Sequence, residues 1–350
     1  MDRHTKAMQV LAAGTVIPAT PLALDENRKF DERQQRLLIR YYLEAGAGGI
    51  ATAVHSTQFE IRKPEINLFE TVLRVVSEEV EGFEAETGKT IVKIAGVCGR
   101  TEQAVAEAQM AKSLGYDAVL LSPGGLGDLT EQQLLDRTRE VAAHMPVIGF
   151  YLQPAVGGRV FSYSYWAQFC EIPNVVAIKS APFNRYLTQD VVRACALSSR
   201  ADEITLYTGN DDNILVDLMT EYRFTVDGRT VTKRFEGGLL GHWCVWTHRV
   251  TELFAQIKDR KITPELLTLA AEITDANGVI FDAANGFAGC IPGIHEILRR
   301  QGLLKGTWCL NPQEVLSDGQ AAEIDRIYHM YPHLNDDGFV KEFLARHECI

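Results

Sequence analysis

The stretch Asn174-Val175-Val176-Ala177-Ile178-Lys179-Ser180 decides the fold of this chain. Its four apolar residues follow one another without polar alternation, which is the pattern of a parallel strand buried on both faces. The run ends at Lys179, and Ser180-Ala181-Pro182 cannot continue it as a central strand. Parallel α/β proteins build their functional sites at the carboxyl ends of their strands. The sequence therefore predicts a lysine at a position where such proteins do chemistry.

Lys179 can be interpreted in two ways from the sequence. If its side chain is buried at the strand end, desolvation lowers the pKa of the ammonium group, and the free amine becomes a nucleophile. The alternative is a lysine that simply reaches solvent, because most lysines are exposed. The rest of the chain decides between these interpretations.

Strand and helix patterns alternate about eight times before residue 258. Each predicted strand is short and apolar, and a segment of helical periodicity, such as the one that Asp31 can cap, separates it from the next. This alternation predicts a (β/α)₈ barrel, with a doubly wound sheet as the alternative. The predicted strands are residues 14–19, 50–54, 91–95, 117–121, 146–151, 174–179, 204–207 and 238–245.

The strand pattern ends after Asp259-Arg260, and the remaining segments have helical periodicity. We therefore predict a catalytic barrel over residues 11–258 and a helical extension over residues 259–350, which packs on the barrel or forms oligomer contacts. Residues 223–235 are polar and charged with β-forming residues between them, which predicts an inserted loop or hairpin. The predicted helices of the extension are residues 264–281, 294–300 and 321–329.

Composition limits the class of protein. The 35 basic and 46 acidic residues give a formal net charge of −11. The sequence has no run of basic residues that could bind along a phosphate backbone, so we expect no nucleic-acid partner. No apolar run is long enough to cross a bilayer, and residues 1–9 lack the apolar centre of a signal peptide. The seven cysteines form no CxxC pair, which predicts reduced thiols in a cytoplasmic protein.

In a barrel, polar residues that follow different strands meet at one mouth. Tyr151 ends the predicted fifth strand and Lys179 the sixth, and a lysine beside a tyrosine suits imine chemistry, in which the phenol relays protons. His55, Ser56 and Thr57 follow the second strand and Asn210 follows the seventh.

Each of these residues also has a structural interpretation. Tyr151 alone is more typical of a core aromatic with a satisfied hydroxyl, and Ser56 and Thr57 alone are also consistent with caps of the next segment. Gly124-Gly125 lies in a glycine-rich loop that lacks the order of a dinucleotide or P-loop motif, although a phosphate-binding barrel stays a third possibility. Only the pair of Lys179 and Tyr151 carries a strong chemical signal.

Two motifs resemble the dihydrodipicolinate synthase and N-acetylneuraminate lyase family. Phe150-Tyr151-Leu152-Gln153-Pro154 is similar to the family's Y-x-x-P motif, and Val176-Ala177-Ile178-Lys179 follows it at the family's spacing. The opening residues 14–21 and the segment 206–211 are also similar to family segments. The resemblance implies a Schiff-base class I aldolase on a (β/α)₈ barrel, with Lys179 as the imine lysine and Tyr151 as the catalytic tyrosine.

Three departures from the family bear on the substrate. The family's G-T-T-G-E loop, which holds the keto-acid carboxylate, is here residues 54–60, where both glycines are absent. The arginine that binds the second substrate in the synthases is displaced to Arg159, and the tyrosine pair after strand four is replaced by Gly124-Gly125. We therefore expect an activity other than authentic dihydrodipicolinate synthase.

Our hypothesis from the sequence is a Schiff-base lyase or aldolase that acts on a 2-oxo acid or a related carbonyl compound, by C–C cleavage, condensation or dehydration. Ser56 and Thr57 would bind the acidic end of a keto-acid or sugar-acid substrate, and His55, Asn210 and Arg159 would shape the rest of the pocket. We expect no metal or organic cofactor, and a homodimer or homotetramer as in relatives. The alternative is a non-catalytic barrel that binds a carbonyl ligand as a sensor or regulator.

Overall fold

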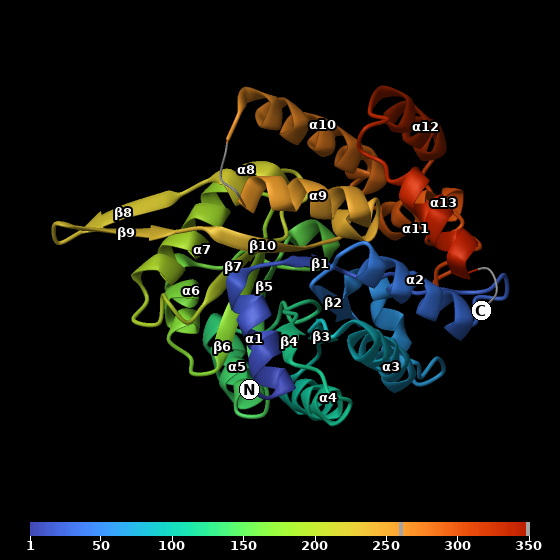
Figure 1. The fold of residues 1–350 in the computed structure, drawn as a ribbon. Coiled ribbons are helices and arrows are strands. Elements are labelled where there is room, and N and C mark those ends of the chain that lie inside the picture. The colour runs from blue at the N-terminus through green and yellow to red at the C-terminus, as the bar shows by residue number, and fades with distance from the viewer. Residues whose placement is uncertain (259–261, 348–350) are drawn as a thin grey trace. The chain divides into compact units, whose positions relative to one another are not determined.

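The computed structural model describes residues 1–258 and 262–347, and it contains an eight-stranded parallel sheet (Figure 1). The strand order is β1-β10-β7-β6-β5-β4-β3-β2, and a parallel bridge between Ala19 and Ala51 joins the first and last strands of that order. Helices alternate with the strands along the chain. The predicted (β/α)₈ barrel is thereby confirmed, and the doubly wound sheet is excluded.

The strands of the barrel are buried almost throughout. Val175–Ala181, the strand from which the prediction began, has one partly exposed residue, Val176, and the other strands repeat this pattern. Continuous burial follows from apolar runs without alternation, as expected for parallel strands covered on both faces. The barrel strands are β1 (Val16–Pro18), β2 (Gly49–Thr52), β3 (Val92–Val97), β4 (Ala118–Leu121), β5 (Val147–Leu152), β6 (Val175–Ala181), β7 (Thr205–Thr208) and β10 (Phe235–Leu240).

Several helices begin at a residue whose side chain caps the helix N-terminus. The Asp31 carboxylate accepts a hydrogen bond from the Gln34 amide at the start of α2, as predicted. The helices are α1 (Arg3–Ala13), α2 (Glu32–Glu44), α3 (Phe69–Thr87), α4 (Thr101–Ser113), α5 (Glu131–Ala142), α6 (Tyr163–Cys170), α7 (Arg185–Leu197), α8 (Ile214–Met219), α9 (Thr247–Lys258), α10 (Pro264–Ile280), α11 (Cys290–Arg300), α12 (Gln320–Met330) and α13 (Asp337–His347). In the part of the chain that the structure describes, no helix has the length and apolarity to cross a membrane.

Two compact units share the strands of the sheet. One contains residues 1–15 and 92–239 and is called here the Lys179 unit; the other contains residues 16–91 and 240 onward and is called the Ser56 unit. The predicted boundary between residues 258 and 259 falls where the described residues stop, so the division into barrel and extension stays a prediction.

In the Lys179 unit, α1 is fixed by polar contacts. The Tyr207 hydroxyl donates to the Leu11 carbonyl at 2.7 Å, and the Arg3 guanidinium contacts the buried Asp117 carboxylate at 2.7 Å. Asp117 also accepts a hydrogen bond from the Lys93 amide at 2.9 Å. The sequence did not predict α1, which therefore owes its place to tertiary contacts as well as to its own residues.

The segment predicted as a loop or hairpin is a hairpin. Its strands β8 (Tyr222–Val226) and β9 (Arg229–Lys233) pair antiparallel, and Figure 1 shows the ribbon extending past α7. Asp227 and Gly228 connect them, both with positive φ, as a two-residue hairpin turn requires. The base of the hairpin packs against α7.

In the Ser56 unit, a buried carboxylate ties the C-terminal helices to the barrel helices. The Asp336 side chain accepts hydrogen bonds from the Tyr41 hydroxyl at 2.6 Å, the His248 amide at 2.9 Å and the Gln301 side chain at 2.8 Å. Three donors compensate for the loss of water around this carboxylate. The helices beyond α9 are therefore an integral part of this unit.

Candidate active site

Lys179 lies in β6 and is almost buried, with 8% of its surface exposed. The strand register aligns it with Phe150 of β5 and Tyr207 of β7. Its Nζ lies 4.4 Å from the centre of the Phe150 ring, whose face attracts an ammonium group. The interpretation as a lysine that simply reaches solvent is therefore wrong, and the amine lies almost buried in β6.

Gly209 makes the space that the lysine side chain occupies. A Cβ atom at this position would lie 2.7 Å from Lys179 Cε and 2.8 Å from Ala181 Cβ, closer than carbon atoms approach one another. Any larger residue after β7 would therefore displace the lysine. Glycine is required here for close approach and not for backbone conformation.

Tyr151 is fully buried in an aromatic cluster on α6. Its hydroxyl accepts a hydrogen bond from the Phe161 amide at 3.1 Å, and its ring packs against Phe161 and Trp166 with centroid distances of 5.5 and 5.2 Å. Burial raises the pKa of this phenol, so the hydroxyl keeps its proton at neutral pH. The hydroxyl therefore carries a proton, while burial weakens its acidity.

Tyr151 and Lys179 occupy neighbouring rungs of adjacent strands. The register pairs Tyr151 with Ser180, whereas Lys179 pairs with Phe150. Successive residues point to opposite faces of a strand, so Tyr151 shares its face with Gly149, whose missing side chain makes room for a ring of α6. Tyr151 therefore lies on the α6 face of β5, opposite the face that carries Phe150 and Lys179, and its predicted role as a proton relay stays a prediction.

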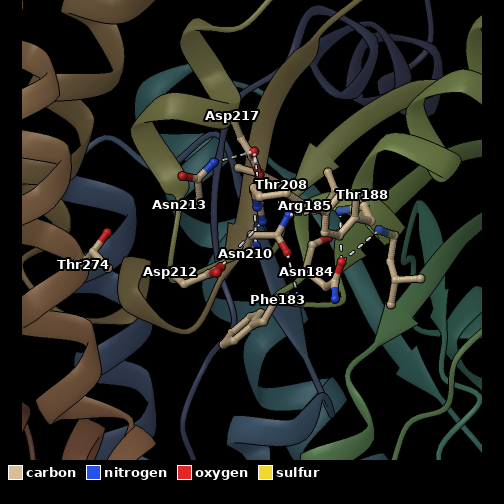
Figure 2. Close-up of polar contacts among 12 residues, drawn as sticks. Phe183, Asn184, Arg185, Thr188, Thr208, Asn210, Asp212, Asn213, Asp217 and Thr274 are labelled. Carbon is tan, nitrogen blue, oxygen red and sulfur yellow. Dashed lines mark hydrogen bonds and ion pairs between the residues drawn. The ribbon is translucent and has the colours of Figure 1, made fainter.

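Asn210 follows β7, and its buried amide is held by protein groups (Figure 2). Its Oδ1 accepts from the Phe183 amide at 3.0 Å, and its Nδ2 donates to Asp217 at 2.9 Å and to Thr188 at 3.3 Å. Phe183 has a φ of 51°, in the left-handed region, and lies four residues after Lys179. The Asn210 side chain therefore fixes the loop that leaves the lysine strand.

Asp217 is the centre of this network and is fully buried (Figure 2). One carboxylate oxygen accepts from Arg185 at 2.6 Å and Asn213 at 3.0 Å, and the other accepts from Thr208 at 2.7 Å and Asn210 at 2.9 Å. These donors come from the first residue of α7, the last residue of β7 and the loop that follows β7. One carboxylate thus organises two adjacent strand ends.

Arg159 lies in the loop after β5 and contacts the loop after β4. Its Nη1 donates to the Leu129 carbonyl at 2.6 Å, and its guanidinium lies 5.5 Å from the centre of the Phe161 ring. Because Phe161 also contacts Tyr151, the arginine supports the aromatic cluster of the tyrosine. Its predicted role in binding substrate stays a prediction.

In the Ser56 unit, the loop after β2 is anchored by its hydroxyl groups. The Ser56 hydroxyl donates to the Ala19 carbonyl at 2.5 Å, and the Thr57 hydroxyl donates to the Thr20 carbonyl at 2.7 Å. His55 is partly exposed, and its ring lies 6.0 Å from that of Phe59. The single proton of each hydroxyl is thus already donated to the protein, which favours a positioning role for Ser56 and Thr57.

Gln58 is a residue of this loop that the sequence reasoning missed. It is buried, with a φ of 69°, where glycine is ordinarily favoured. Its Oε1 accepts from the Leu310 amide at 2.6 Å, while among the described residues its Nε2 has no hydrogen-bond partner. The available signal was the absence from residues 54–60 of both glycines of the family's loop.

Asp217 and Gly209 were also missed as functional positions. Gly209 was visible in the Thr208-Gly209-Asn210 segment, but its contact with Lys179 depends on the register of β6 and β7. The described residues contain no group of three or more histidine, cysteine, aspartate or glutamate side chains placed to hold a metal ion. The expectation of a reaction without metal or organic cofactor stays a prediction.

The sequence comparison identifies the family. Residues 12–222 match the model of the Dihydrodipicolinate synthetase family. The chain belongs to this family. It is 28% identical over 142 residues to the 4-hydroxy-tetrahydrodipicolinate synthase of Clostridium novyi (39% of this chain, 46% of the relative), and 26% identical over 211 residues to that of Oleidesulfovibrio alaskensis (59% and 66%). The chain thus matches about half to two thirds of the length of these curated relatives.

Solved structures show the same fold across nearly the whole chain. Dihydrodipicolinate synthase from Cyanidioschyzon merolae superposes with a TM-score of 0.73 at 20% identity, covering 91% of this chain and 98% of that one. N-acetylneuraminate lyase from Fusobacterium nucleatum superposes with a TM-score of 0.70 at 17% identity, covering 91% and 99%. The predicted family resemblance is confirmed, and the fold extends beyond the segment matched in sequence.

Proposed function

We propose that this chain is a Schiff-base-forming lyase or aldolase that acts on a 2-oxo acid or a related carbonyl compound. The observation that carries the proposal is Lys179, an almost buried lysine in a parallel strand of a family member, with its side chain admitted by Gly209. The amine attacks the substrate carbonyl, and the resulting carbinolamine loses water to form an imine. The protonated imine then withdraws electrons from the neighbouring C–C or C–O bond.

Tyr151 is proposed as the proton donor in these steps. Its raised pKa keeps the phenol protonated, and the Phe161 amide orients its oxygen. Tyr151 lies one rung from Lys179 but on the opposite face of the sheet, so the proposed role requires water molecules that carry the proton around the strand end.

The substrate class follows from the departures in the loop after β2. We propose a keto acid or sugar acid whose acidic end this loop recognises, with Ser56 and Thr57 holding the loop on residues 19–20. Residues 54–60 lack both glycines of the family's loop, and this supports a substrate other than that of the curated synthases. We also propose that the chain forms a homodimer or homotetramer in the cytoplasm.

Borohydride trapping with pyruvate and longer 2-oxo acids tests the proposal. We expect a stable adduct on the peptide that contains Lys179 and none in the variant Lys179→Arg, read by intact and peptide mass spectrometry. Lys93 is also buried in a strand, so its peptide is an internal control that should stay unmodified. An adduct spread over several lysines, or none with any keto acid, would contradict the proposal.

A sensor that binds a carbonyl ligand without turnover is the second candidate. The observation that favours it is the donation of both loop hydroxyls, Ser56 and Thr57, to backbone carbonyls. Saturable binding of a 2-oxo acid without product, across a screen of substrates, would select this candidate over the lyase.

A further inference from the structure

The hairpin of β8 and β9 has no part in the proposed chemistry. It begins at Tyr222, the last residue that the family model matches, and extends past α7 as a ribbon of two strands (Figure 1). Within the part of the chain that the structure describes, no third strand pairs with either of them. A ribbon of two strands is only marginally stable in water, because three or more strands are ordinarily needed to support an apolar face. The hairpin therefore presents a strand edge that another strand can complete.

β8 is the outer strand of this ribbon. β9 makes most of the contact with α7, and Figure 1 shows β8 on the side away from that helix. In a hairpin with a two-residue turn, the residue pair that flanks the turn exchanges two hydrogen bonds, and every second pair beyond it does the same. The register places Val226 opposite Arg229 beside the turn, so Phe224 also bonds to β9. The backbone N–H and C=O groups of Arg223 and Thr225 consequently point to the open edge of β8.

The side chains of the ribbon divide into an apolar face and a polar face. Phe224 and Val226 lie on one face of β8, and Val231 of β9 is directly opposite Phe224. Val226 remains 44% exposed. On the other face, the hydroxyl oxygens of Thr225 and Thr230 lie 3.2 Å apart. Apolar surface thus lies open to solvent beside an unpaired strand edge, a combination that favours pairing with another chain.

The charges of β8 fit a second copy of the same strand. When a strand pairs antiparallel with its own copy, residues at equal distances from the twofold axis face each other. With Thr225 at the axis, Arg223 of each copy faces Asp227 of the other copy, and Phe224 faces Val226. The Arg223 side chain is 71% exposed, so it can reach the other copy. One axis thus gives two pairs of opposite charge and two apolar pairs.

The same symmetry excludes β9 as the edge that pairs with its own copy. With Val231 at the axis, Arg229 would face Lys233 of the other copy, and like charges directly opposite each other are destabilising. The Lys233 ammonium also donates to the Ile204 carbonyl of its own chain at 2.7 Å. Only β8 is therefore complementary to itself.

Arg223 has a contact within its own chain that this pairing must replace. Its guanidinium lies 2.7 Å from the Glu221 carboxylate, which Arg234 also contacts. Glu221 therefore keeps a cation when Arg223 turns towards Asp227 of the other copy. Because ion pairs at exposed positions are weak, the exchange costs little.

We propose that β8 is an association edge, at which two copies of this chain join their hairpins antiparallel about Thr225 into one four-stranded sheet. The backbone groups of Thr225 point outward, so the two central residues exchange two hydrogen bonds. The apolar face then continues from one copy to the other. The inference names the surface for the proposed homodimer or homotetramer and rests on that part of the proposed function, but not on the imine chemistry. Because strands of five residues make a small interface, we expect assembly to depend on protein concentration.

Sedimentation velocity of the full chain over a range of concentrations tests the proposal. Thr225→Pro removes an N–H group that points to the open edge and takes no part in the pairing with β9. We expect this variant to sediment with half the mass of the wild-type assembly. Thr230→Pro is the matched control, because it changes the residue directly opposite on β9, whose N–H group points away from β8. It should assemble as the wild type does.

A second pair of variants tests the position of the axis. Asp227→Asn keeps a residue that tolerates the φ of 49° in the turn but removes the charge that faces Arg223, so association should weaken several-fold. Gly228→Asn changes the neighbouring turn residue without changing the charge, and it should assemble as the wild type does. Equal assembly of both variants would contradict an axis at Thr225. If Thr225→Pro does not fold, as judged by its melting temperature, this second pair decides the proposal.

The remaining outcomes separate this inference from the proposed function. A wild-type chain that is monomeric at every concentration would overturn both the paired edge and the proposed association, and would leave the edge to a strand of another protein. An assembly that Thr225→Pro leaves intact would overturn the paired edge alone, because the copies would then meet through another surface. Borohydride trapping on Lys179 reads the imine chemistry independently of either result.

Discussion

At the scale of single residues, the space around Lys179 depends on one missing side chain. Gly209→Ala would place a methyl group 2.7 Å from Lys179 Cε and 2.8 Å from Ala181 Cβ, so the lysine must move. Because a displacement of about 1 Å in a reacting group costs on the order of 100-fold in rate, we expect imine trapping to slow at least ~10-fold. Overpacking should cost about 1–3 kcal/mol of unfolding free energy.

Gly127→Ala is the matched control for this prediction. A Cβ atom at Gly127 meets no atom within 4 Å, so neither stability nor trapping should change. If Gly209→Ala traps keto acids at the wild-type rate, the contact with Lys179 has no bearing on the position of the amine.

Two variants of Gln58 separate the free-energy cost of its backbone conformation from the cost of losing its side-chain hydrogen bond. Gln58→Gly and Gln58→Ala both remove the side chain that accepts from Leu310, so that loss is common to both variants. Only alanine keeps a Cβ atom at a φ of 69°, which costs roughly 1 kcal/mol relative to glycine. We therefore expect urea denaturation to show the glycine variant as more stable than the alanine variant by about 1 kcal/mol; the reverse order would show that the position is not strained.

At the scale of elements, one buried carboxylate joins the loops after β6 and β7. Asp217→Ala leaves the donors from Thr208, Asn210 and Arg185 without their acceptor, and breaking such a buried network costs about 3–5 kcal/mol. Asn213→Ala removes one donor to the same carboxylate and should cost only about 1 kcal/mol. Chemical denaturation measures the loss of unfolding free energy in both variants. Equal losses would mean that the groups around Asp217 do not act as one network.

At the scale of the whole molecule, the barrel was predictable because its strands are short apolar runs with clear ends. The buried strand at Lys179 and the cap at Asp31 follow from local sequence alone. Helix α3 begins only at Phe69, after a 3₁₀ helix over residues 59–62 and a turn over residues 64–66. The helices α1 and α13 were missed, and contacts with distant segments hold both, such as that of Tyr207 with Leu11 and that of Tyr41 with Phe343.

The candidate site was less predictable than the fold for the same reason. Lys179 and Tyr151 stand out as residue types at strand ends, whereas the roles of Asp217 and Gly209 appear only when two strands are in register. The positive φ of Gln58 has no signature in sequence, because the residue is not glycine. The sequence thus predicts which residue types can do chemistry, while the contacts that position these residues depend on tertiary structure.

The dependence of overall stability on pH follows from buried groups with opposite effects. Burial lowers the pKa of His242 and of His295 to about 4, so between pH 6.5 and 4 the unfolded chain binds protons that the folded chain does not, and stability falls as the pH drops. Burial, followed by the charge of Glu60, raises the pKa of Glu314 to about 7, so this group alone makes the protein more stable as the pH falls from 7 towards 4.5.

The destabilisation from His242 and His295 exceeds the stabilisation from Glu314, so we expect the protein to lose stability on acidification. Each histidine contributes at most about 3 kcal/mol over its range, since one pKa unit corresponds to about 1.4 kcal/mol. Urea denaturation at pH 7 and pH 5 should therefore show a smaller loss in His295→Gln than in the wild type, and a larger loss in Glu314→Gln. His329→Gln changes an exposed histidine and serves as the control. If Glu314→Gln instead reduces the loss, Glu314 does not oppose the histidines, and the balance between these buried groups is wrong.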